Sequence, residues 1–124
     1  MSRILVVDDS GFSRRLLRKI LEQAGHDVLE AADGLTALER YAVERPDAVV
    51  LDLTMPDISG FDLLPQLLSF EPPARVLVAT ADIQTSVQRW VSETGAGFVA
   101  KPFVAEQVLN GLNIVLGQPG GKAH

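Results

Sequence analysis

The chain alternates, five times over, between a short apolar run and a longer stretch whose apolar residues recur with helical spacing. Three of the runs contain apolar residues only: Ile4 to Val7, Ala48 to Leu51 and Val76 to Ala79. Uninterrupted apolar runs of this length are typical of strands that are covered on both faces of a parallel sheet. Two weaker runs, about Asp27 to Ala32 and Gly97 to Ala100, complete the set. The alternation predicts an α/β protein with a doubly wound, five-stranded parallel sheet and five helices.

The stretches between the runs have the apolar spacing of amphipathic helices. Their first apolar residues are Phe12, Leu35, Phe61, Ile83 and Val104. Gly25 follows the first stretch, as a glycine commonly does just past the end of a helix. Pro65 lies inside the third stretch and cannot donate a backbone hydrogen bond, so we expect a kink or a late start of that helix.

The length of 124 residues and the 47% share of hydrophobic residues fit one compact domain with a core of its own. We expect this domain to span residues 1–117, and we expect residues 118–124, with their Gly and Pro, to form a disordered tail. So short a tail does not make an output domain. The sequence leaves two possibilities open, a stand-alone domain and a domain cut from a longer protein.

Composition excludes several classes of function. Acidic residues outnumber basic ones by 16 to 11, and the net charge of -5 disfavours direct binding to nucleic acids. The absence of cysteine excludes disulfides, thiol catalysis and thiolate metal sites. The sequence has two histidines, His26 and His124, which lie far apart in the chain. This number and separation disfavour a histidine metal cluster and a Ser–His triad. No apolar run approaches the roughly 20 residues that span a bilayer. The start of the chain does not fit a signal peptide, so we expect a cytoplasmic protein without membrane contact.

Polar side chains follow four of the five predicted strands. The first strand ends on Asp8 and Asp9, the third on Asp52 and the fourth on Thr80, while the fifth ends just before Lys101. Each residue alone has an ordinary interpretation, such as a helix cap or a solvated lysine. The carboxyl ends of parallel strands meet at one edge of a sheet, where ligands bind in this architecture. We therefore expect these five side chains to converge, which chance seldom produces.

The charges of this group indicate its chemistry. Three carboxylates within a few ångströms repel one another, and one lysine offsets a single charge, so a further cation is needed. Hard oxygen ligands of this kind select Mg²⁺ or its relatives, with waters in the remaining positions. A carboxylate beside Mg²⁺ and an ammonium is well placed to attack phosphorus and form an aspartyl phosphate.

At this point four motifs show a resemblance to the receiver domain of two-component response regulators. They are Val6-Val7-Asp8-Asp9-Ser10, Asp52-Leu53-Thr54-Met55-Pro56 with Gly60, Ala79-Thr80-Ala81, and the segment 95–103 around Phe98 and Lys101-Pro102. Together, in this order and at these spacings, the motifs are highly specific, and the resemblance covers essentially the whole chain. It implies a flavodoxin-like fold with the strand order 2-1-3-4-5.

The resemblance also implies a role for each matching residue. Asp52 would accept a phosphoryl group from a phosphohistidine on a sensor histidine kinase or a phosphotransfer protein. Asp9 would bind Mg²⁺ directly and Asp8 mainly through water, with Asp52 and the backbone carbonyl of Thr54 as further ligands. The domain would catalyse only its own phosphotransfer and slow autodephosphorylation, and would otherwise be a signalling protein rather than an enzyme.

Further residues would carry the signal out of the site. Lys101 would pair with a phosphoryl oxygen, Thr80 would move in to hydrogen-bond another, and Phe98 would turn inward as Thr80 moves. The Lys101-Pro102 peptide bond is expected to be cis. A downstream protein or output domain would bind the face formed by the fourth helix, the fifth strand and the fifth helix.

A few positions leave the interpretation open. Phe98 stands where the family often has a tyrosine. Thr54 and Asp82 lie at positions that modulate the lifetime of the phosphoryl group in this family. Asp82 could position a water or cap the fourth helix, and we favour the cap. That helix begins with weak helix formers, Gln84-Thr85-Ser86, so we expect its first turn to be mobile before phosphorylation. Trp90 in the same helix could be partly exposed or could belong to the core.

Three other functions remain as alternatives. A pseudo-receiver that binds partners without phosphorylation usually lacks part of the acidic group, Thr80 or Lys101. A flavin or nucleotide binder of the same architecture needs phosphate donors at the start of the first helix, where Asp8 and Asp9 stand. A metal-dependent phosphatase with an aspartyl intermediate typically has a second aspartate two residues after the nucleophile, where this chain has Thr54.

Overall fold

The computed structural model describes residues 2–55 and 57–117, and these form one five-stranded parallel sheet with helices on both faces. The strands lie in the order β2-β1-β3-β4-β5, which confirms the expected fold. Their bounds are β1 Arg3–Val7, β2 Asp27–Ala31, β3 Ala48–Leu51, β4 Val76–Thr80 and β5 Gly97–Ala100. The tail predicted for residues 118–124 lies outside the described residues.

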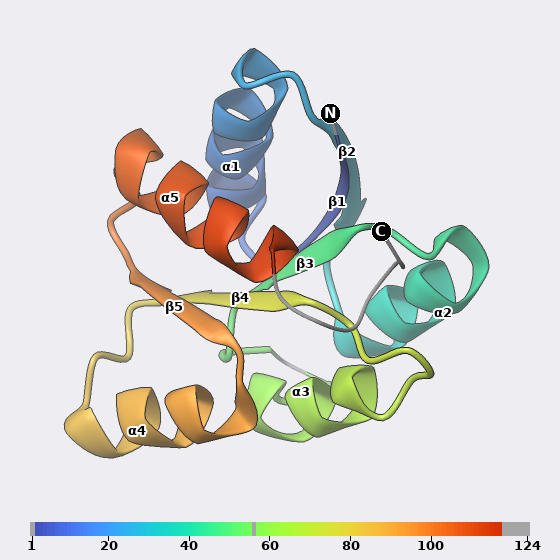
Figure 1. Cartoon of the computed structure of the whole chain (residues 1–124), viewed down its shortest axis with the longest axis vertical. Coiled ribbons are helices and arrows are strands. Elements are labelled where there is room, and N and C mark those ends of the chain that lie inside the picture. Colours follow the sequence, from blue (N-terminus) through green and yellow to red (C-terminus); the bar gives the residue numbers. More distant parts are fainter. Residues whose placement is uncertain (1, 56, 118–124) are drawn as a thin grey trace.

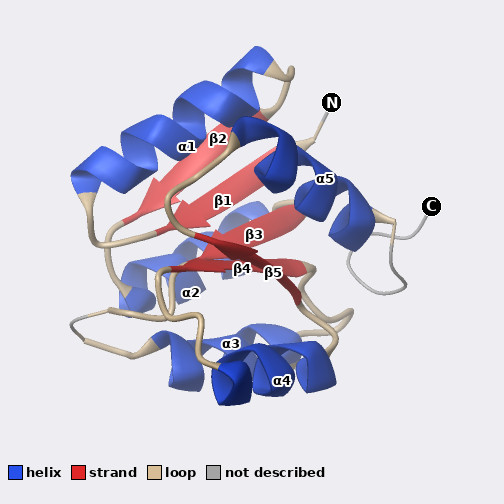
Figure 2. Cartoon of the chain, turned by 90° about the vertical axis from the view of Figure 1, so that its left-hand side faces the viewer, coloured by secondary structure: helices blue, strands red, loops and turns tan. Residues whose placement is uncertain are grey.

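The helices are divided between the two faces of the sheet. They are α1 Gly11–Gln23, α2 Gly34–Glu44, α3 Gly60–Leu68, α4 Thr85–Thr94 and α5 Ala105–Leu116. Helices α1 and α5 cover one face, and α2, α3 and α4 cover the other (Figures 1 and 2). None of these helices is both long and apolar enough to cross a membrane.

Alternate residues of the central strands supply the two cores. In β1, Leu5 and Val7 face the core under α2, α3 and α4, while Ile4 and Val6 face the core under α1 and α5. Each of the four is fully buried. Burial on both faces is the reason that the central strands are unbroken apolar runs in the sequence.

Of the two expectations for α3, a kink or a late start, the late start is wrong, because the helix begins at Gly60 and continues through Pro65, while the kink stays a prediction. A proline inside a helix costs about 3 kcal/mol. Leu63, Leu64 and Leu67 are fully buried, and each contributes roughly 1.5–3 kcal/mol by its burial. Packing of the three leucines therefore outweighs the missing hydrogen bond.

Several expected element ends were off by one or two residues. The strand expected to reach Ala32 ends at Ala31. The helices expected from Ile83 and Val104 begin at Thr85 and Ala105, and the side chains of Ile83 and Val104 are largely exposed. Phe12 does lie in α1, but its side chain is 70% exposed and contributes little to the core.

Candidate functional site

The three acidic residues expected to converge do so at the carboxyl edge of the sheet. Asp8, Asp9 and Asp52 each offer a carboxylate oxygen, and these oxygens lie within 4.8 Å of one another. Asp8 and Asp52 are only 1% and 6% exposed, while Asp9 is exposed. The site is therefore closed on its inner side and open to solvent at Asp9.

Backbone hydrogen bonds place Asp8 and Asp52 at the ends of neighbouring strands. The Asp8 N–H donates to the Ala31 carbonyl at 3.1 Å, and the Asp52 N–H donates to the Val7 carbonyl at 2.9 Å. These bonds extend the sheet by one residue past β1 and β3. The positions of the two aspartates follow from the ladder of the sheet itself.

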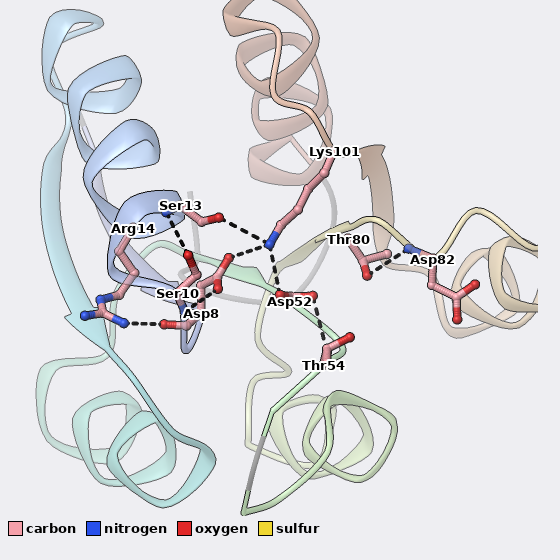
Figure 3. A network of polar contacts seen from close by, with 9 residues as sticks. All are labelled: Asp8, Ser10, Ser13, Arg14, Asp52, Thr54, Thr80, Asp82 and Lys101. Carbon is pink, nitrogen blue, oxygen red and sulfur yellow. Dashed lines mark hydrogen bonds and ion pairs between the residues drawn. The ribbon is translucent and has the colours of Figure 1, made fainter.

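Lys101 joins the two buried carboxylates. Its Nζ lies 2.9 Å from Asp8 Oδ2 and 3.0 Å from Asp52 Oδ2, between the two strands (Figure 3). Burial of the ammonium acts to lower the pKa of Lys101, but the hydrogen bonds and charges of Asp8 and Asp52 outweigh burial and raise it. Lys101 thus remains charged at neutral pH and offsets one of the three carboxylate charges.

The second oxygen of each buried carboxylate is held by a local turn. Asp8 Oδ1 accepts from the Ser10 N–H at 2.9 Å, and Asp52 Oδ1 accepts from the Thr54 N–H at 3.2 Å. With Lys101 on the other oxygen, both carboxylates are fixed in rotation. Thr54 itself is exposed and lies next to Asp52, where its carbonyl was expected to bind the metal.

Gly60 brings the start of α3 against the chain that follows Asp52. Its N–H donates to the Leu53 carbonyl at 2.8 Å. A Cβ at this position would lie 2.3 Å from Leu53 Cα and 2.9 Å from the Asp52 carbonyl oxygen. Only glycine permits so close an approach.

Thr80 ends β4 at the same edge but makes a different contact. Its side chain is buried, and its Oγ1 accepts from the Asp82 N–H at 3.3 Å (Figure 3). Asp82 Oδ1 accepts from the Gln84 N–H at 3.2 Å. Asp82 therefore closes a turn ahead of α4 and does not cap the helix itself, whose N-cap residue is Gln84.

Phe98 lies half-buried on β5. It lines a groove of about 530 Å³ together with residues of β5, α5, α4 and the loop before α4, among them Ile83 of that loop and Gln107 and Ile114 of α5. The groove lies on the face where a partner was expected.

The sequence interpretation missed two residues of α1 that contact the site. Ser13 Oγ lies 3.4 Å from Lys101 Nζ, and Arg14 Nη1 donates to the Asp8 carbonyl at 2.6 Å. Both lie about one helical turn after Asp9, and no signal in the apolar spacing distinguishes them from the solvent-facing polar residues of this helix.

Comparison with known proteins identifies the family of the chain. A sequence model of the family described as the response regulator receiver domain matches residues 4–113. The chain belongs to the response regulator receiver domain family. This receiver domain is 42% identical over 119 residues to Protein CcdB of Bacillus subtilis, covering 94% of this chain and 99% of the relative. It is 36% identical over 115 residues to the chemotaxis protein CheY of Thermotoga maritima, covering 91% and 96%.

Solved structures agree on the fold of the receiver domain. Chemotaxis response regulator CheY4 of Vibrio cholerae superimposes with a TM-score of 0.84 at 30% sequence identity, covering 93% of this chain and 98% of that one. The Lys101-Pro102 peptide bond is cis, as expected. The family and the strand order predicted from the sequence are both confirmed.

The acidic site of this receiver domain fits a hard divalent cation. Its donors are all oxygens, and the three carboxylates carry more negative charge than Lys101 offsets. Such a donor set, partly buried and open on one side, suits Mg²⁺ with water in its remaining positions.

Trp90 belongs to the interface between α3 and α4. Its side chain is half-buried, and its ring centroid lies 5.2 Å from that of Phe61 on α3. The tryptophan therefore contributes to helix packing and does not line the groove around Phe98.

Proposed function

We propose that this receiver domain accepts a phosphoryl group on Asp52 from a phosphohistidine of a sensor histidine kinase or a phosphotransfer protein. The observation that carries the proposal is the double contact of Lys101 with Asp8 and Asp52, at 2.9 and 3.0 Å, beside the exposed carboxylate of Asp9. In that arrangement a nucleophilic carboxylate, a fixed ammonium and a cation-binding donor set lie together.

The transfer is a substitution at phosphorus. An oxygen of Asp52 attacks the phosphorus, and the new O–P bond forms as the P–N bond to the histidine breaks. The electron pair of the broken bond stays on the imidazole nitrogen, which takes a proton from solvent. Lys101 is placed to stabilise the negative charge on the phosphoryl oxygens.

The carboxylates of Asp8, Asp9 and Asp52 and the carbonyl of Thr54 would hold Mg²⁺. When bound, Mg²⁺ neutralises negative charge that the three carboxylates and the phosphoryl oxygens bring together. The N–H groups of Ser10 and Thr54 and the ammonium group of Lys101 hold the carboxylate oxygens of Asp8 and Asp52 in place without the ion. In this proposal the domain catalyses only the transfer of the phosphoryl group to its own Asp52 and the slow loss of that group. It is not an enzyme for other molecules.

Phosphorylation adds about two negative charges and three acceptor oxygens at Asp52. The Thr80 hydroxyl, now bonded to the Asp82 N–H, would turn to a phosphoryl oxygen, and Phe98 would follow it inward. The groove around Phe98 would change shape, and a partner protein or output domain would read the face of α4, β5 and α5. In this proposal residues 1–117 form the receiver domain of a cytoplasmic protein that contacts neither membrane nor nucleic acid.

Intact mass measurement tests the proposal. The protein is incubated with acetyl phosphate or phosphoramidate and Mg²⁺, and we expect the mass to rise by one phosphoryl group. The Asp52→Asn variant should show no such gain, and EDTA should abolish it in the unmodified protein. Labelling of Asp52→Asn would place the phosphoryl group elsewhere. No labelling of the unmodified protein and no metal binding would favour the pseudo-receiver adaptor.

A further inference from the structure

Arg14 links the acidic site to a strand outside it. Its Nη1 donates to the Asp8 backbone carbonyl at 2.6 Å, as Figure 3 shows. Its Nε donates to Glu30 Oε1 on β2 at 3.0 Å. One guanidinium thus bridges the β1–α1 turn and the neighbouring strand, with its side chain only 20% exposed.

The Asp8 carbonyl matters because it belongs to the peptide group that leads into Asp9. The peptide group is planar, so the direction of the Asp8 carbonyl also fixes the direction in which the chain leaves for Asp9. Among residues 2–55 and 57–117, no donor forms a hydrogen bond to the Asp9 carboxylate. The placement of that carboxylate therefore depends on its backbone, and Arg14 holds the backbone immediately before it.

Glu30 keeps Arg14 in place. Its second oxygen, Oε2, accepts from Arg18 Nε at 2.7 Å, so the carboxylate lies between two arginines of α1. Burial acts to raise the pKa of Glu30, but the two arginines outweigh burial and lower it. Glu30 is consequently charged at neutral pH. Arg18 also binds Glu22 and the Val28 carbonyl and makes no contact with the acidic site.

We infer that Arg14 is a positioning residue of the cation site, which acts through the Asp8 carbonyl to aim Asp9 at the bound ion. The inference rests on the proposed function. Two simpler roles predict different behaviour. An ion pair that only ties α1 to β2 would affect stability and leave cation affinity unchanged. A positive charge that only lies near the carboxylates would weaken cation binding, so its removal would strengthen binding.

The test compares Arg14→Ala with Arg18→Ala. Both variants remove one positive charge and one ion pair to Glu30, but only the first removes the contact with Asp8. The Kd for Mg²⁺ is measured from backbone amide NMR shifts during MgCl₂ titration at constant ionic strength. Loss of partners that orient metal ligands typically weakens metal binding by about 10–100-fold. We expect Arg14→Ala to weaken Mg²⁺ binding by about tenfold. Arg18→Ala should stay within about twofold of the unmodified protein, because Arg18 does not contact Asp8 and its loss leaves the bonds of Arg14 to Asp8 and Glu30 intact.

Unchanged or tighter binding by Arg14→Ala would overturn the inference, and so would equal weakening in both variants. Arg14→Lys keeps the charge but loses the planar fork that reaches Asp8 and Glu30 together. Arg14→Lys should also weaken Mg²⁺ binding. It replaces Arg14→Ala in the test if thermal unfolding without metal shows that Arg14→Ala is not folded. If the unmodified protein binds no Mg²⁺, the proposed function fails and the inference with it. If that protein binds Mg²⁺ and both Arg14 variants match it, only the inference fails.

Discussion

The acidic side of the site and the Thr80 side are built differently. On the acidic side, Asp8 and Asp52 continue the sheet ladder, and their carboxylates are each held by a backbone N–H and by Lys101. On the other side, the Thr80 hydroxyl has, among the described residues, one hydrogen bond, which it accepts from the Asp82 N–H at 3.3 Å. The side-chain oxygens of Asp8 and Asp52 are thus held at more points than the Thr80 hydroxyl, which fits the proposal that the acidic side binds the phosphoryl group and the Thr80 side moves in response.

The helix starts on the two sides differ in the same way. Helix α1 begins beside the carboxylates, and its N-cap Ser10 accepts from the Ser13 N–H at 3.2 Å. Helix α4 begins after Asp82, and its N-cap Gln84 makes no side-chain cap hydrogen bond. A helix start without a cap has backbone N–H groups that only water satisfies, so its first turn opens more readily.

The largest expected effect concerns the acidic side. Lys101→Met should lower the rate of phosphorylation by acetyl phosphate by about 10²–10³, the usual loss for one donor at a developing charge. The rate is followed by intact mass at saturating Mg²⁺. Lys19→Met is the matched control, because Lys19 is exposed on α1. A rate within twofold of the unmodified protein would show that Lys101 does not act on the phosphoryl group.

Gly60→Ala should be the next most damaging change. Its Cβ would meet the backbone of Asp52 and Leu53, which cannot yield as a flexible side chain can. Overpacking of this kind typically costs 1–3 kcal/mol, so we expect a loss of about 2 kcal/mol in urea unfolding. Gly117→Ala, where the nearest atoms lie at 3.6 Å, should change stability by less than about 0.5 kcal/mol. Equal stability of the two variants would contradict the close approach.

The contrast between the helix starts gives a third prediction. Gln84→Ser should add the missing cap and slow amide hydrogen exchange over residues 85–88, with a gain of about 1 kcal/mol in local opening free energy. Ser10→Ala should have the opposite effect at the start of α1. Uniform protection across residues 82–90 in the unmodified protein would refute a mobile first turn and remove the contrast.

The smallest expected effect is a pH dependence at Glu30. Its pKa is lowered in the folded protein, because the arginines outweigh burial. A lowered folded pKa means that Glu30 contributes stability above its unfolded pKa, near 4.3, and loses that contribution as the pH falls through the folded value. Glu30→Gln should thus be less stable than the unmodified protein at pH 7, by no more than about 1 kcal/mol, and the gap should close in acid. Urea unfolding at several pH values measures the gap, and a gap that widens in acid would contradict the sign.

The sequence predicted the sheet well because each central strand is buried on both faces and leaves an unbroken apolar run. The convergence of Asp8, Asp52 and Lys101 followed from the same short strands, since a residue just past a strand end has little freedom of position. The ends of α4 and α5 were predicted less well. Ile83 and Val104 continue the helical spacing, but they lie ahead of the helices and are exposed.

Arg14 and Ser13 could not be identified from the pattern, because polar residues on an amphipathic helix usually face solvent. Their contacts depend on the angle at which α1 packs on the sheet, which apolar spacing does not specify. The sequence likewise does not predict that the Thr80 hydroxyl accepts a hydrogen bond from the Asp82 N–H. The roles of Asp52, Thr80, Phe98 and the metal ligands stay predictions.

Trp90, whose ring contacts Phe61, provides an intrinsic fluorescence probe. Trp90 is the single tryptophan of the sequence, and its ring lies against α3 at a centroid distance of 5.2 Å. Its emission therefore reports the packing of α3 against α4. A fluorescence change on addition of a phosphoryl donor would signal movement of α4, whereas binding of Mg²⁺ that leaves α4 in place would be optically silent.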